Sequence, residues 1–157
     1  MPVPAVKGGA IETLITGLIE TNEKQRLMEL LIYSPYNKEA ALASRNYKYS
    51  QFIWIRYSLI NKVINLATRT LSRILKNQIP HFGVIQMLIS LKKERCDFVL
   101  VEGNEQILRP ISDRVGVNKT FFHLHARLFT NPEVYSYCNK VITVSDYIRQ
   151  EVLLNTE

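Results

Sequence analysis

Short apolar runs rich in β-branched and aromatic residues alternate along this chain with longer stretches of helical periodicity, and this alternation limits the possible folds. Five runs read as strands, at residues 28–34, 52–55, 97–101, 119–125 and 140–145. Each connection is long enough for a crossover helix, so the strands are expected to run parallel. The sequence therefore predicts an α/β fold, a Rossmann-like parallel sheet with helices on both faces in one domain over residues 1–157.

Helices are expected at residues 10–23, 57–76, 83–94 and 106–114, with a closing helix from Asp146 that Ser145 caps. The amino-terminal residues depart from the usual pattern of such sheets. Doubly wound sheets place a strand before the glycine turn that opens the first helix. Here only seven residues, two of them proline, precede Gly8. The first strand of the expected sheet is missing.

The net charge of +6 is concentrated in one part of the chain. Residues 40–93 contain nine basic residues and no acidic one, so this block carries +9 and the rest carries −3. On the helix expected at 57–76, four of the basic residues lie opposite the apolar stripe: Lys62, Arg69, Arg73 and Lys76. They form either a plain solvated face or a surface for an anionic partner. A membrane is favoured over nucleic acid because no stacking aromatics are interleaved with these charges.

Several classes of protein are disfavoured. The longest uncharged apolar stretches reach about half of the roughly 20 residues that span a bilayer, and the amino-terminal residues lack the apolar stretch of a secretory signal. We therefore expect a cytoplasmic protein. Cys96 and Cys138 are far apart and belong to no CxxC pair, which favours reduced, inert thiols over a disulfide or a structural zinc site.

Candidate binding residues stand where the carboxyl ends of the strands are expected, because ligands collect at that edge of such sheets. Gly8 and Gly9 open the first helix, and their lack of a Cβ lets a diphosphate approach the backbone amides. A purely structural turn is the alternative. His123 and His125 share one face at the end of their strand and could bind a sugar hydroxyl or phosphate, or orient a reacting group. The alternative is a pair of buried, hydrogen-bonded strand histidines.

Two further polar residues are candidates at the same edge. Glu102 follows the strand at 97–101 and could contact a polar ligand, although Gly103 and Asn104 beside it could simply cap the next helix. Arg127 could meet an anionic group, or could be an exposed loop residue. No metal is expected, since no third ligand at fitting spacing accompanies the two histidines. No nucleophile elbow supports a hydrolase.

Three segments together resemble the family 4 glycosyltransferases, the retaining GT-B enzymes that use nucleotide sugars. They are PVPAVKGGAIETLITGLIE at residues 2–20, FFHLHARL at 121–128 and CNKVITVSDYIRQEVL at 138–153. Among these enzymes they are most similar to bacterial capsular and exopolysaccharide transferases, rhamnosyltransferases included. The resemblance covers essentially the whole chain, but only the amino-terminal half of such an enzyme.

The resemblance implies an amino-terminal, acceptor-binding half of the enzyme. Gly8 and Gly9 match the glycines that lie against the donor diphosphate, and Glu12 matches the glutamate of the first helix. His125, with His123 as the other possibility, matches the cleft histidine near the reacting sugar. The donor is a nucleotide sugar bound as substrate, without metal or other cofactor, and the acceptor is a glycan or a lipid-linked glycan.

The sequence departs from the family at two places, since neither the strand before Pro2 nor the carboxyl-terminal donor domain is present in it. We therefore expect no transferase activity from the 157 residues alone, with a partner chain as one possible source of the donor domain. One alternative is a basic Rossmann-like module that binds an anionic membrane or nucleic acid without catalysis. A Rossmann oxidoreductase is disfavoured because neither GxGxxG nor its companion acidic residue is present.

Overall fold

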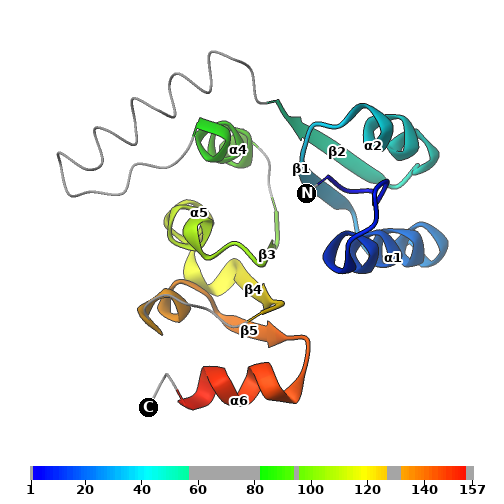
Figure 1. Cartoon of the computed structure of the whole chain (residues 1–157). Coiled ribbons are helices and arrows are strands. Elements are labelled where there is room, and N and C mark those ends of the chain that lie inside the picture. Colours follow the sequence, from blue (N-terminus) through cyan, green and yellow to red (C-terminus); the bar gives the residue numbers. More distant parts are fainter. Residues whose placement is uncertain (1, 57–81, 94–95, 127–131, 155–157) are drawn as a thin grey trace. The chain divides into compact units, whose positions relative to one another are not determined.

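The computed structural model describes residues 2–56, 82–93, 96–126 and 132–154 (Figure 1). These residues form an α/β structure in which every strand pairing is parallel, as the sequence predicts. The expected strands are present, with ends that shift by at most two residues. The chain divides into two compact units, Met1–Thr70 and Leu71–Glu157. The helix expected at 57–76 lies outside the described residues.

The first unit consists of α1 (Ala10–Gln25), β1 (Leu30–Pro35), α2 (Lys38–Ala43), the short 3-10 helix η1 (Ser44–Asn46) and β2 (Ser50–Ile55). The two strands pair along their whole length, from Leu30 opposite Ser50 to Pro35 opposite Ile55. The pattern of residues does not predict α2. Its start is nevertheless encoded, because the Asn37 side chain accepts hydrogen bonds from the backbone N–H groups of Glu39 and Ala40.

Side-chain hydrogen bonds hold α1 and the residues before it. The Val3 N–H donates to the hydroxyl of Ser34 on β1 at 2.9 Å, and Ser34 is almost fully buried. At the other end of α1, the buried Asn22 side chain pairs with both backbone groups of Met28, at 2.9 and 3.1 Å. Ile19 is the most buried apolar residue of α1. These contacts fix the path of the chain from the glycine turn into β1.

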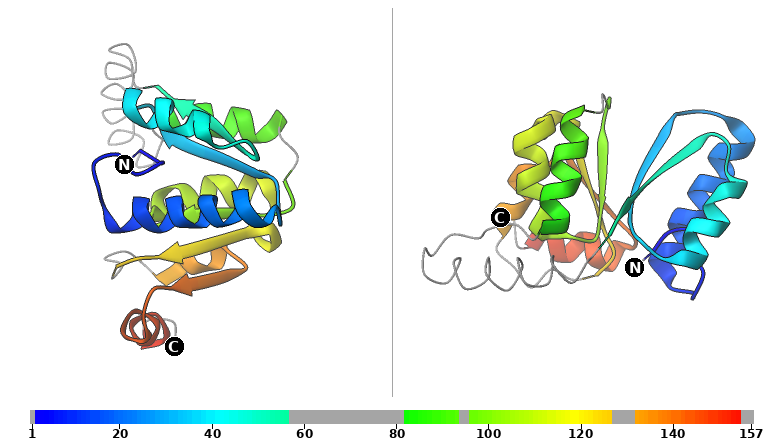
Figure 2. Two further views of the ribbon diagram at one scale, coloured as in Figure 1. Left: turned by 90° about the vertical axis from the view of Figure 1, so that its right-hand side faces the viewer. Right: turned by 90° about the horizontal axis from the view of Figure 1, so that it is seen from above.

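The second unit begins with α4 (Phe82–Lys93), β3 (Val99–Glu102), the 3-10 helix η2 (Glu105–Ile107) and α5 (Leu108–Val115). It continues with η3 (Val117–Lys119), β4 (Thr120–Leu124), η4 (Pro132–Tyr137), β5 (Lys140–Thr143) and α6 (Asp146–Leu154). Its strands form one parallel sheet in the order β3-β4-β5, and α5 packs against β4 (Figure 2). Phe122, Leu108 and Ile111 are nearly inaccessible and form its core. The predicted cap of α6 is confirmed by the Ile148 N–H, which donates to the Ser145 hydroxyl at 3.3 Å.

Hydrogen bonding joins the described strands into two sheets, of two and three strands, where the sequence analysis expects one. Among the described strands, β1 and β3 are therefore each at the end of a sheet.

Candidate functional site

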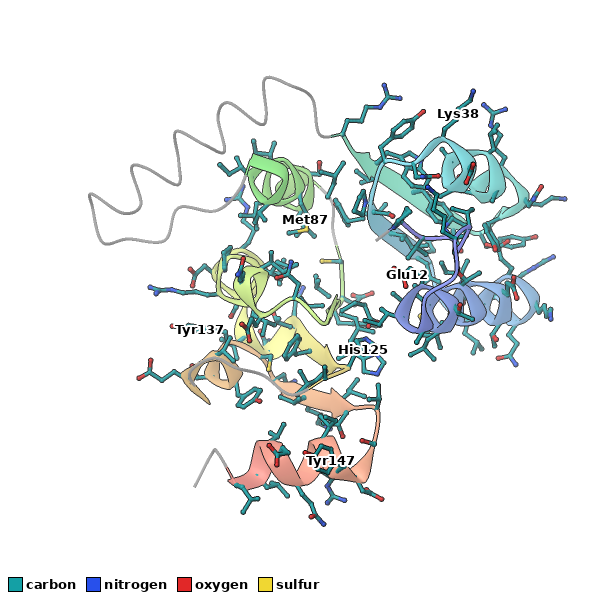
Figure 3. The ribbon with its side chains drawn as sticks, viewed as in Figure 1. Glu12, Lys38, Met87, His125, Tyr137 and Tyr147 are labelled. Atoms are coloured by element: carbon teal, nitrogen blue, oxygen red, sulfur yellow. The ribbon has the colours of Figure 1, made fainter. Side chains whose placement is uncertain are left out.

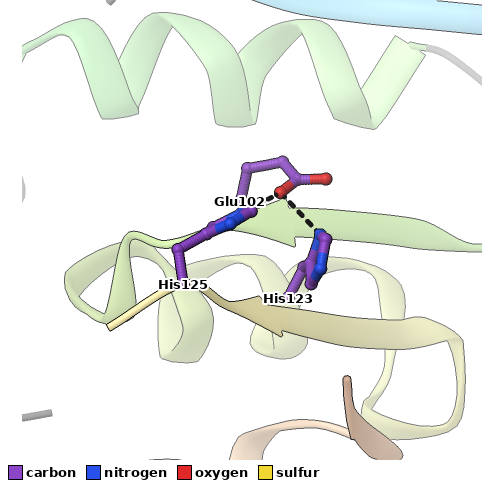
Figure 4. Close-up of polar contacts among 3 residues, drawn as sticks. All are labelled: Glu102, His123 and His125. Carbon is purple, nitrogen blue, oxygen red and sulfur yellow. Dashed lines mark hydrogen bonds and ion pairs between the residues drawn. The ribbon is translucent and has the colours of Figure 1, made fainter. Parts of the chain in front are cut away.

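A cluster of one carboxylate and two imidazoles lies at the carboxyl ends of two neighbouring strands (Figures 3 and 4). Glu102 is the last residue of β3, and His123 is its register partner on β4. His125 follows directly after the end of β4. The Nδ1 atom of His123 lies 3.0 Å from Glu102 Oε2, and the Nε2 atom of His125 lies 2.6 Å from the same oxygen. One carboxylate oxygen thus holds both rings.

The alternation of the strands explains why these three side chains meet. Val101, Phe122 and Leu124 are buried on one face of the sheet. The residues between or next to them, Glu102 and His123, consequently point to the other face, and His125 continues that alternation. The Gly103 N–H donates to the His123 carbonyl at 2.9 Å and extends the pairing one residue beyond β3. The cluster is therefore built on paired backbone.

The cluster is shielded but still accessible. The side chains of His123, His125 and Glu102 are 12%, 10% and 20% exposed. The two rings are 4.2 Å apart between centroids and tilted by 50°. The two histidines are thus shielded and hydrogen-bonded, as the interpretation without a ligand predicts. They also lie at the carboxyl ends of the strands, where the interpretation with a ligand places them. The structure is compatible with both interpretations.

The sequence identifies each member of the cluster but not their contact. The spacing of two residues places His123 and His125 on one face, whereas Glu102 stands 21 residues before His123. Their proximity depends on β3 and β4 being neighbours, which the residue pattern does not specify. One feature of the sequence could have indicated the contact: both strands end in polar residues, and the carboxyl ends of adjacent parallel strands meet at one edge of a sheet.

The glycine turn forms a second candidate site, in the first unit. Gly8 and Gly9 precede α1 with φ values of 78° and 138°. Glu12, in the first turn of α1 (Figure 3), is 4% exposed. Its carboxylate lies so close to Gly9 that a Cβ at position 9 would collide with Oε2. Among the described residues, that oxygen has no hydrogen-bond donor. The turn thus presents backbone amides at a helix N-terminus, with a buried carboxylate oxygen beside them.

Other predicted site residues lie outside the described part of the chain: Arg127, Lys62, Arg69, Arg73 and Lys76. Both cysteines are free thiols, and burial raises the pKa of Cys138, which keeps its sulfur protonated. Among the described helices, no segment combines the length and hydrophobicity that crossing a bilayer requires.

No family model, curated protein or solved structure matches this chain. The site must therefore be interpreted from its own chemistry. Imidazole and carboxylate groups at a strand edge can donate and accept hydrogen bonds, transfer protons, or ligate a cation. The ligating atoms of Glu102, His123 and His125 all lie within 4.8 Å of one another.

Proposed function

We propose that the chain is the amino-terminal, acceptor-binding half of a nucleotide-sugar-dependent glycosyltransferase in bacterial surface polysaccharide synthesis. The observation that carries the proposal is the Glu102–His123–His125 cluster at the carboxyl ends of β3 and β4. α/β proteins bind small polar ligands through polar groups at this edge of a parallel sheet. The resemblance of three segments to family 4 glycosyltransferases supports the assignment to sugar chemistry.

In this proposal, His125 and His123 bind and orient a hydroxyl group of the acceptor sugar. Each imidazole uses one nitrogen for Glu102, so the opposite nitrogen is the atom assigned to the sugar. Glu102 is a positioning residue, because its Oε2 atom fixes the orientation of both rings. A hydroxyl held in one orientation reacts faster than a freely rotating one, which is the contribution expected from an acceptor-side site.

The glycine turn is assigned to the donor. Backbone amides at the start of α1 are suited to a diphosphate, because helix N-termini favour negative charge and Gly8 and Gly9 allow close approach. The unpartnered oxygen of Glu12 would accept a hydrogen bond from a hydroxyl group rather than contact the phosphates. Arg127 is proposed to contact an anionic group of the substrates.

The proposed reaction transfers a glycosyl group from a nucleotide sugar to a glycan or lipid-linked acceptor, and the transfer step needs no cofactor. We place the protein in the cytoplasm, where a peripheral position on an anionic membrane would bring it to lipid-linked acceptors. The basic residues Lys62, Arg69, Arg73 and Lys76 are assigned to that membrane contact. A partner chain could supply the donor domain.

Nuclear magnetic resonance titration with sugars tests the acceptor assignment. The full chain, labelled with ¹⁵N, is titrated with a panel of hexoses and deoxyhexoses that includes rhamnose. At least one sugar is expected to shift the amide signals of Glu102, His123 and His125, with His125→Gln weakening binding about tenfold, the loss of roughly 1.4 kcal/mol. His81→Gln, which changes the chain's third histidine, is the matched control. The assignment is wrong if no sugar shifts these signals at tens of millimolar, or if His125→Gln binds as well as the parent chain.

A further inference from the structure

We propose that Glu102, His123 and His125 form a binding site for one zinc ion, with three protein ligands and one position open to water. Two imidazole nitrogens and a carboxylate oxygen are donors that zinc accepts in proteins. Magnesium and calcium prefer oxygen ligands throughout, so the two histidines select against them. The inference does not depend on the proposed transferase function.

The distances in the cluster are close to those of a zinc site. The three ligating atoms lie within 4.8 Å of one another, and two of the separations are 3.0 and 2.6 Å. Zinc bonds of about 2.0–2.1 Å at tetrahedral angles separate the ligand atoms by roughly 3.3 Å. To surround an ion, the three side chains must rotate so that the two short separations from the Glu102 oxygen lengthen (Figure 4).

The protons of the cluster can be rearranged without changing its charge. In the metal-free form, His123 Nδ1 and His125 Nε2 face one carboxylate oxygen, an arrangement satisfied when both carry protons. Neutral imidazole has a second tautomer, with the proton on the other ring nitrogen. In that tautomer, both nitrogens that face Glu102 present lone pairs, and a divalent cation replaces the two protons between the three atoms.

The backbone that carries the ligands is fixed before any ion binds. Glu102 and His123 are register partners, and the hydrogen bond from Gly103 to His123 closes the ladder beside them. The neighbouring Val101 and Leu124 are each 2% exposed and anchor the strands on the opposite face. Since little ordering remains to be done, the site loses little affinity to conformational entropy. The three ligand side chains are partly exposed, so the site is accessible to solvent.

Calorimetric titration of the metal-stripped, full-length chain with Zn²⁺ tests the proposal. One ion per chain is expected to bind with a dissociation constant in the micromolar range or below, whereas Mg²⁺ gives no binding heat. Glu102→Gln, His123→Gln and His125→Gln should each weaken zinc binding at least about tenfold. His81→Gln and Cys96→Ser remove other potential zinc ligands and should leave the affinity unchanged. Circular dichroism establishes that each variant is folded.

A second measurement uses the unaltered chain and so does not depend on the folding of variants. Addition of Zn²⁺ should shift the ring proton signals of His123 and His125 in nuclear magnetic resonance spectra and leave those of His81 in place. The proposal is overturned if one equivalent of zinc does not bind, if binding survives all three cluster substitutions, or if the His81 ring responds instead. Because no sugar is present, a negative result here leaves the sugar titration to decide the transferase proposal separately.

Discussion

Gly9 occupies a backbone conformation that other residues rarely adopt. Its φ is 138°, and a Cβ at this position would collide with the buried carboxylate of Glu12. Gly9→Ala is expected to destabilise the protein by about 1–3 kcal/mol, because it adds both backbone strain and a contact that must be relieved. Urea denaturation measures the change.

Gly17 is the matched control for that substitution. It lies in the interior of α1, and a Cβ there would meet nothing within 4 Å. Gly17→Ala should stabilise the protein by about 0.5–1 kcal/mol, because alanine is the better helix former. Opposite signs for the two glycines are the expected result, whereas equal effects would contradict the account of Gly9.

At this scale, the sequence predicts positions better than contacts. The common face of His123 and His125 follows from a spacing of two on a strand. The shared contact with Glu102 does not follow, because it requires β3 and β4 to be neighbours. Likewise, the glycine pair is visible in the sequence, but the close approach of the Glu12 carboxylate to Gly9 is visible only in the structure.

At the scale of elements, Asn22 connects the end of α1 to the start of β1. Its side chain donates to the Met28 carbonyl and accepts from the Met28 N–H, and it is 5% exposed. Asn22→Ala removes both hydrogen bonds, which are partly buried, so a loss of about 1–3 kcal/mol is expected. Thr21→Ala, at an exposed position of the same helix, should change the stability by less than about 0.5 kcal/mol. Thermal unfolding measures the stability of the two variants. Similar losses of stability in Asn22→Ala and Thr21→Ala would contradict the role of Asn22.

Glu23 makes the link between α1 and β2 sensitive to acid. Its carboxylate accepts hydrogen bonds from the Lys48 and Tyr49 N–H groups and from the Ser50 hydroxyl, at 2.7 to 3.1 Å. Desolvation raises the pKa of Glu23, but these hydrogen bonds outweigh it, so the pKa lies below the ordinary value of 4.5. The stabilisation is therefore complete above the unfolded-state value and is lost as the pH falls through the lowered pKa.

Glu23→Gln should consequently lower the melting temperature at pH 7, and the difference from the parent chain should shrink as the pH is lowered below about 4.5. Glu29→Gln removes an equal charge from an exposed position and should show no such convergence. Melting curves recorded between pH 7 and pH 3 make the comparison. A difference between parent and Glu23→Gln that stayed constant over this range would contradict the account.

Element types follow from the sequence more reliably than element ends. The strand at Thr120–Leu124 is recognised by its aromatic, alternating pattern, and the cap by Ser145 is recognised by residue type. The helix at Lys38–Ala43 is not predicted, because six residues are too few to display a helical period. Its signal is the cap residue Asn37, which is informative only in the context of a turn after Pro35.

At the scale of the molecule, the parallel α/β class is predictable, and the division of the strands into two sheets was not predicted. The class follows from alternating periods and long connections. The division does not follow, because the residue pattern predicts the strands and their direction but not which strands are hydrogen-bonded to each other.

The two sheets should differ in local stability. A two-stranded parallel pair has no central strand, whereas β4 is hydrogen-bonded to β3 and to β5. Hydrogen–deuterium exchange read by mass spectrometry should therefore show slower exchange for the amides of β4 than for those of β1 and β2. Exchange in β1 that is as slow as in β4 would contradict this expectation.

The way the cluster is assembled also makes it an indicator of correct folding. A slip of β4 by one residue against β3 would turn His123 and His125 to the opposite face and separate both from Glu102. The chain has three histidines, so their ring signals form a small and well-separated spectroscopic set. The environments of two of them depend directly on strand register. Refolded or engineered preparations can thus be judged by whether these two rings show their paired environment.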